Sequence, residues 1–223
     1  MKRARDALPP FGYAYTTATI KGARAMMTPR ERVMERACFA HWHAEFRRMG
    51  VQPGVDAPSI AYTVHCLVDE RMQVMRETSK HGPDIKCKRG CAACCHLSVD
   101  VSPQEAILLR VIAKDQGIPI DEARLDRQAS KSFDTWHELP VEDRRCVFLG
   151  EDNACRVYEH RPGACRKYTV KSDPERCDMD KYPGGEVAIV FDVEAEIIQS
   201  AAMTVFGARS MAEQLIATRE GPA

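Results

Sequence analysis

Residues 87–95 read CKRGCAACC, which places four cysteines within nine positions and makes two of them, Cys94 and Cys95, neighbours in the chain. The stretch follows the helix-ending sequence HGP at 81–83 and precedes a helix-starting pattern at 102–105. It therefore decides the expected layout: helices lie on either side, and the cysteines lie in an irregular loop where a ligand can approach. A disulfide framework, a redox dithiol and a metal site are the three explanations for such crowding.

Two capping boxes predict the helices on either side of this loop. The sequences TPRE at 28–31 and SPQE at 102–105 each combine an N-cap hydroxyl, a proline at the first helical position and a following glutamate. The first box predicts a helix to about residue 49, and the second predicts a helix through residue 116. Helical patterns also cover 59–80 and 121–138. The apolar or small face of the first helix is predicted to contain Val33, Ala37, Ala40 and Ala44.

The rest of the chain predicts small extended elements and one more helix. CVFL at 146–149 and CRVY at 155–158 flank GEDNA, which is typical of a short hairpin. The segment that begins AIVFD at 188 predicts a short strand followed by a single C-terminal helix. We therefore expect a mainly α fold with small irregular or β-hairpin elements, in which helices surround a cysteine-rich metal-binding core. The predicted divisions are a flexible basic leader (1–27), an N-terminal helical pair (28–84), a cysteine-cluster metal-binding domain (85–180) and a C-terminal helix packed on the same core (181–223).

Composition and charge narrow the class of protein. Lys plus Arg and Asp plus Glu both number 32, so no overall basic field indicates nucleic acid as a partner. No apolar run is long enough for a membrane helix, and the N-terminus shows no apolar stretch before a small-residue cleavage site. We therefore predict a cytoplasmic protein without a membrane partner. Thiols remain reduced in that compartment.

Two of the three explanations for the cysteines fit poorly. Disulfide frameworks are typical of small secreted domains, and adjacent Cys94 and Cys95 lack the Cα separation that a mutual disulfide needs. The CAAC at 91–94 has the spacing of a redox dithiol, but no βαβ unit surrounds it. The Cys-x3-Cys-x2-Cys spacing of Cys87, Cys91 and Cys94 is that of radical-SAM enzymes, yet no alternation of strands and helices follows.

A metal site fits the spacing of the cysteines and the charge around them. Four thiolates complete the shell of a zinc ion or a [4Fe–4S] cluster, and basic residues beside cysteines favour the thiolate. Adjacent Cys94 and Cys95 point in different directions, so two metals, or one ligand and one supporting residue, are both possible. The candidate ligands form two arms: Cys87, Cys91, Cys94 and Cys95, and then Cys146, Cys155, Cys165 and Cys177.

The cysteine-rich first arm, CVFL at 146–149 and CRVYEHRPGACRKY at 155–168 together resemble the YkgJ-type cysteine-cluster family, the CxxCxxCC proteins. The resemblance covers about residues 85–178. It implies a zinc- or iron-chelating domain of largely unassigned role. One departure is that Cys87 lies one residue further from Cys91 than the family name implies. Flagellin lysine N-methylases are similar over this domain, which implies that the module can also belong to an enzyme with an iron–sulfur centre.

Two function classes therefore remain open. The first is a binding module that chelates zinc or iron, with a protein as a further partner. The second is a metal-dependent enzyme that performs redox or methylase-like group transfer on a protein. No catalytic motif is visible, which favours the binding module.

Other potential ligands have simpler interpretations. A second metal site could use residues of the first two helices, but neither helix has a typical paired-ligand spacing. The candidates are Cys38, His41, His43 and Glu45 on the first helix and His65, Cys66 and Asp69 on the second. We therefore predict that Cys38 and Cys66 are buried core residues. His96 is a candidate ninth ligand because it directly follows the double cysteine.

Overall fold

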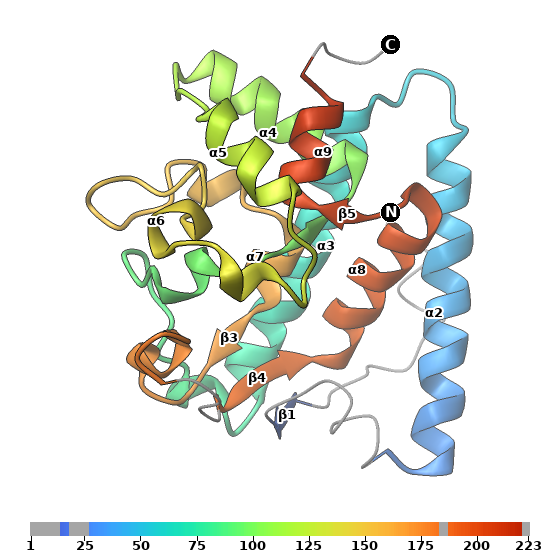
Figure 1. Cartoon of the computed structure of the whole chain (residues 1–223). Helices are drawn as coiled ribbons and strands as arrows, with labels where there is room; N and C mark the ends of the chain where they lie inside the picture. The colour runs from blue at the N-terminus through green and yellow to red at the C-terminus, as the bar shows by residue number, and fades with distance from the viewer. Residues whose placement is uncertain (1–13, 18–26, 183–186, 220–223) are drawn as a thin grey trace.

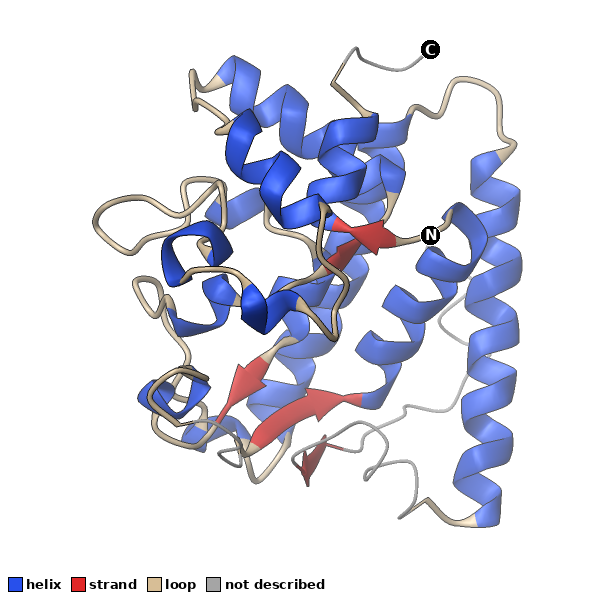
Figure 2. Cartoon of the chain, viewed as in Figure 1, coloured by secondary structure: helices blue, strands red, loops and turns tan. Residues whose placement is uncertain are grey.

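The computed structural model describes residues 14–17, 27–182 and 187–219, and it is mainly α-helical (Figures 1 and 2). Within those ranges eight α-helices accompany five short strands, so the predicted mainly α class is confirmed. Two groups of helices meet along the central helix α3, Ala57–Thr78, which packs against helices of both groups and against the short helix that carries Cys165. Among the described residues, no helix combines the length and apolar character needed to cross a membrane.

The first group consists of α2 (Pro29–Gly50), α3 and α8 (Val193–Phe206). Helix α2 runs beside α8 at one side of the molecule (Figure 1). Phe46 of α2, Val68 of α3 and Ile198 of α8 are almost fully buried in a shared apolar core. Burial of each such side chain contributes about 1.5–3 kcal/mol to the stability of the fold. This core contains none of the candidate cysteine ligands, so its stability does not depend on them.

The buried face of α2 differs from the predicted one. Val33 is 57% exposed, and Ala37, Ala40 and Ala44 are also exposed, whereas Cys38 and Phe46 are buried. The predicted face was wrong because Phe46, with Trp42 packed beside it, removes far more apolar surface from water than a row of alanines. The predicted capping box is confirmed: the Thr28 hydroxyl accepts from the Glu31 amide, and Glu31 accepts from the Thr28 amide.

The second group consists of α4 (Pro103–Asp115), α5 (Glu122–Ala129) and α9 (Met211–Ala217). Leu109, Leu125 and Leu215, one from each helix, are fully buried together with Phe148. Phe148 belongs to the segment between the cysteines at 146 and 155. The hydrophobic core of this group therefore anchors the second cysteine arm directly.

Two small antiparallel sheets complete the described structure. In the first, β4 (Ile189–Asp192) lies between β1 (Ala14–Thr17) and β3 (Thr169–Val170). In the second, β2 (Asp100–Val101) pairs with β5 (Arg209–Ser210). Strand β1 lies inside the predicted flexible leader, of which residues 1–13 and 18–26 lie outside the described ranges.

Three predicted elements differ from the structure. Residues 121–138 are not one helix, since α5 ends at Ala129 and a turn leads to a separate 3₁₀ helix. The C-terminal segment contains two helices, because Gly207 with a φ of 85° separates α8 from α9. The predicted hairpin consists of a single antiparallel bridge between Leu149 and Cys155.

Short helical turns surround the cysteines. They are short because the segments between the cysteines lack a long run of apolar residues at helical spacing. Their bounds are η2 (Gly82–Asp84), η3 (Ala93–His96), η4 (Trp136–Glu138), α6 (Val141–Arg144), η5 (Tyr158–His160), α7 (Gly163–Lys167) and η6 (Pro174–Cys177).

Candidate metal centre

The first cysteine arm begins with a tight turn. Gly90 has a φ of 86°, a conformation that glycine adopts without steric cost, and the Cys91 amide donates to the Lys88 carbonyl at 3.1 Å. This turn returns the chain towards Cys87 within three intervening residues. The longer spacing between Cys87 and Cys91 is therefore compatible with both thiols lining one pocket.

Backbone hydrogen bonds attach this arm to strand β3. The Lys86 amide donates to the Val170 carbonyl at 2.9 Å, and the Val170 amide donates to the Cys87 sulfur at 3.2 Å. A donor directed at sulfur favours its thiolate form. Cys87 is thus held in the pocket by a contact that no sequence pattern indicates.

The second arm is held by apolar packing on both sides of its turn. Val147, Phe148 and Val157 are buried in the core of α4, α5 and α9, and Cys146 and Cys155 pack partly against that core. The Arg156 amide donates to the Phe148 carbonyl at 2.8 Å, which fixes the two segments beside each other. The two cysteines therefore lie at the edge of this core, where they also line the pocket between the arms.

Cys165 lies on the short helix α7, which a buried polar network positions. The Glu105 carboxylate accepts from the Gly163 amide at 2.8 Å and lies 3.1 Å from His65 Nε2. Gly163 itself packs so closely on Gln199 that a Cβ there would stand 1.8 Å from the amide oxygen. Helices α3, α4 and α8 thus all determine where Cys165 lies.

The structure brings the two arms together. The Cys146 amide donates to the Cys95 carbonyl at 2.8 Å, which joins the arms directly through their cysteine backbones. The turn η3, which contains Cys94 and Cys95, also packs against η6, which ends at Cys177. Trp136 Nε1 donates to the His96 carbonyl at 2.8 Å and so supports the end of η3. These contacts place segments about 50 residues apart in sequence around one site.

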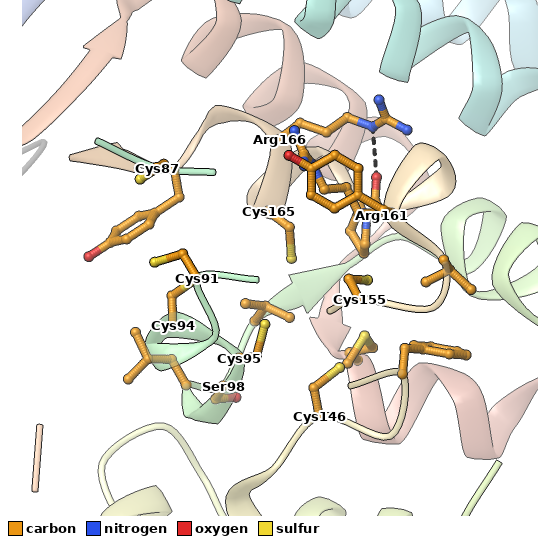
Figure 3. A pocket seen from close by; sticks show the side chains of 18 of the residues that line it. Cys87, Cys91, Cys94, Cys95, Ser98, Cys146, Cys155, Arg161, Cys165 and Arg166 are labelled. Carbon is orange, nitrogen blue, oxygen red and sulfur yellow. Dashed lines mark hydrogen bonds between the residues drawn. The ribbon is translucent and has the colours of Figure 1, made fainter. Parts of the chain in front are cut away.

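A cavity of about 140 Å³ lies between the arms, and Figure 3 shows its lining. Cys177 instead lines an adjoining cavity of about 630 Å³, to which Cys91 also contributes. His96 lines this adjoining cavity and not the cysteine pocket. The cysteines that line the smaller cavity are Cys87, Cys91, Cys94, Cys95, Cys146, Cys155 and Cys165.

The pocket disfavours negative charge on its thiols. Burial, together with the charges of the neighbouring thiols Cys155 and Cys94, raises the pKa of Cys146 to about 12. Burial, followed by the charges of Cys94, Cys87 and Cys91, raises the pKa of Cys177 to about 12. For Cys94 the largest cause is its hydrogen bond with Cys95, and burial raises its pKa as well. A bound cation would reverse this balance, because it neutralises thiolates that otherwise repel one another.

Arg161 is the basic residue most closely associated with the pocket. Its guanidinium lies 4.0 Å from the centre of the Tyr158 ring, and its buried Nε has no hydrogen-bond partner among the residues that the structure describes. Its charge lowers the pKa of four of the thiols. Several other nearby arginines bind the backbone instead: Arg145 donates to the Gly150 carbonyl at 2.5 Å, and Arg156 to the Val147 carbonyl at 2.5 Å. Much of the positive charge near the cysteines therefore stabilises their loops.

The other candidate ligands are engaged elsewhere. His65 contacts Glu105, Asp69 pairs with Arg166, and Glu45 pairs with Arg48. Cys38 is buried as predicted, but the prediction that Cys66 is buried was wrong, since its position on α3 is exposed. Because the described helix pair uses these carboxylates and His65 in other contacts, a second metal site there is not supported.

The donor set of the pocket fits a thiophilic metal. Zinc, Cu(I) and iron–sulfur clusters all take thiolate ligands, and the pocket offers sulfur from several segments. Within the described ranges, no group of three His, Cys, Asp or Glu side chains already stands where it could hold an ion. Closure of a coordination shell therefore requires cysteine side chains to move towards a common point.

Comparison with known families agrees with this chemistry. A family model, CxxCxxCC, matches residues 86–182, and its description is "Putative zinc- or iron-chelating domain". The segment 86–182 therefore resembles the CxxCxxCC family in sequence. The matched range contains all eight candidate cysteines and leaves out Cys38 and Cys66. The predicted resemblance is thereby confirmed, because YkgJ-type proteins belong to the same family. No curated protein and no solved structure matches the chain.

Proposed function

We propose that the CxxCxxCC domain chelates zinc or iron through its eight cysteines, and that the helices around it serve as the scaffold of this site. The observation that carries the proposal is the pocket itself, in which seven thiols from both arms surround one small cavity. The chelating description of the matched family model supports it independently.

The scaffold has features that a chelating site needs. The arms are tied to each other through Cys95 and Cys146 and to two separate hydrophobic cores. Such anchoring reduces the conformational entropy that metal binding must overcome. A single zinc ion and a [4Fe–4S] cluster each take four thiolates, so the proposal covers both forms of the metal.

Chelation of a metal explains the cysteine-lined pocket without any catalytic step. No feature of those residues singles out redox or group transfer on a protein partner, which was the alternative from sequence. The expected cytoplasmic location is consistent with reduced thiols but remains a prediction.

Metal analysis of the full chain tests the proposal. Protein purified without oxygen should contain zinc or iron in proportion to chain, and stripped protein should take up zinc when titrated. Brown protein with broad visible absorption would indicate an iron–sulfur cluster, whereas colourless protein with bound zinc would indicate a zinc site. A chain that holds no metal after purification and takes up neither zinc nor iron would contradict the proposal.

Single substitutions locate the site. Serine at Cys91, Cys94 or Cys165 should reduce the metal content, because each thiol lines the pocket. Cys66→Ser is the matched control, since Cys66 is exposed on α3 and lies outside the pocket. Equal loss of metal in Cys66→Ser and Cys94→Ser would show that the pocket is not the site.

A further inference from the structure

The neighbouring residues Cys94 and Cys95 lie at the boundary between two groups of thiols. Both belong to the 3₁₀ helix η3, in which successive side chains are about 120° apart around the axis. The two side chains therefore leave the axis of the turn in different directions. Figure 3 shows Cys87, Cys91 and Cys94 towards one side of the pocket and Cys95, Cys146, Cys155 and Cys165 towards the other.

The first group is completed by the last cysteine of the second arm. Cys177 ends η6, which packs against η3, and it lines the adjoining cavity together with Cys91. Cys177 therefore lies with the first arm in space, although it belongs to the second arm in sequence.

The second group is completed by the last cysteine of the first arm. The Cys95 carbonyl accepts from the Cys146 amide at 2.8 Å, so Cys95 lies beside the second arm. Cys165 lines the same cavity as Cys146 and Cys155. The bridge between Leu149 and Cys155 keeps Cys155 near this group.

We propose that the eight cysteines form two separate four-thiolate centres, a division that rests on the proposed chelating function. Cys87, Cys91, Cys94 and Cys177 form one centre, and Cys95, Cys146, Cys155 and Cys165 form the other. Each set has the number of thiolates that completes a tetrahedral zinc site or holds one [4Fe–4S] cluster. Each arm gives three ligands to one centre and one ligand to the other, so the two centres cross-link the arms.

Protection of the thiols in the unaltered full chain provides the first test. The metal-stripped chain is loaded with zinc under reducing, oxygen-free conditions and then exposed to a rising concentration of chelator. At each step an alkylating reagent marks the free thiols, and mass spectrometry of the peptides reports each cysteine. Cys177 should become reactive together with Cys87 and Cys91, and Cys95 together with Cys146 and Cys155. Release of all eight thiols in a single step, or of Cys177 with Cys165, would overturn the division.

Paired serine variants provide the second test. The full chain should bind about two zinc ions, and a pair of substitutions within one set should leave about one. The variants Cys87→Ser/Cys177→Ser and Cys155→Ser/Cys165→Ser are the pairs within sets, and Cys87→Ser/Cys155→Ser is the pair across sets. The pair across sets should lose nearly all zinc, whereas Cys66→Ser should keep the content of the unaltered chain.

The outcomes separate the division from the function on which it rests. If the unaltered chain takes up neither zinc nor iron, the chelating function itself is contradicted. If it binds zinc but all three pairs lose the same amount, the function stands and the division into two centres is wrong. Serine at Cys94 and at Cys95 adds a further comparison, because the two variants should expose different sets of thiols to alkylation.

Discussion

At the scale of single residues, Glu105 links three helices through one buried carboxylate. It closes the capping box of α4 by accepting from the Ser102 amide at 2.9 Å, contacts His65 of α3, and accepts from the Gly163 amide of α7. Burial alone would raise its pKa, but these hydrogen bonds outweigh burial and hold the pKa below the usual value. The carboxylate therefore stabilises the fold in its charged form.

This lowered pKa predicts how stability depends on pH. The contribution of Glu105 is complete above the pKa of an unfolded glutamate, about 4.3, and is lost as the pH falls through the lower folded value. Glu105→Gln should cost about 1–3 kcal/mol at neutral pH, because it leaves buried donors poorly paired, and the variant should lose less stability than the unaltered chain on acidification. Urea unfolding at neutral and acidic pH measures both effects.

The matched control is Glu213→Gln. Glu213 closes the equivalent capping box of α9 with Ser210, but that box is exposed to solvent. Its substitution should cost less than that of Glu105 and leave the acid dependence nearly unchanged. Similar losses in both variants would show that the buried network contributes no more than an ordinary helix cap.

Arg161 gives a second prediction at this scale. The positive charge of Arg161 favours the thiolate form of nearby cysteines, including Cys94 and Cys165. Four thiolates around a divalent ion carry a net negative charge, which a nearby positive charge stabilises. Arg161→Gln should therefore weaken zinc binding, and the loss should decrease as salt is added. Arg48→Gln is the control, because Arg48 pairs with Glu45 on α2 and lies outside the pocket. Equal zinc affinity in the two variants would contradict a role for Arg161 at the site.

At the scale of the elements, the contact between α2 and α8 shows how packing selects one face of a helix. Phe46 is fully buried and packs against Phe206 with the ring centres 6.4 Å apart. Phe46→Ala should destabilise the fold by about 3–5 kcal/mol, because it removes a large side chain and leaves a cavity. Val33→Ala, on the exposed face of the same helix, should change stability by less than about 0.5 kcal/mol. Denaturant unfolding of both variants decides between the two faces, and a larger effect at Val33 would restore the face predicted from sequence.

At the scale of the whole molecule, the two halves depend on metal to different degrees. The helices α2, α3 and α8 share an apolar core, whereas the cysteine arms consist of short turns such as η3, η6 and the five-residue helix α7. Short turns form few cooperative hydrogen bonds and need other constraints to remain ordered.

Metal removal should therefore loosen the molecule unevenly. After treatment with a strong chelator, amides in 87–95 and 146–177 should exchange with solvent much faster, while those of α3 and α8 should keep most of their protection. Hydrogen exchange followed by mass spectrometry measures the two regions in one sample. A control sample with metal restored should recover the slow exchange. Equal protection of the cysteine arms with and without metal would show that metal does not stabilise them.

The sequence by itself determined the mainly helical class, the capping boxes at Thr28 and Ser102, and the family of the cysteine-rich segment. These features depend on local hydrogen bonding and on residue spacing, which the chain carries without reference to its partners in space. Tertiary structure decided the buried face of α2 and the exposure of Cys66, because both depend on which surface removes the most apolar area from water. It also decided which cysteines lie together: chain order separates Cys177 from Cys91, but the packing of η6 on η3 brings their segments to one cavity.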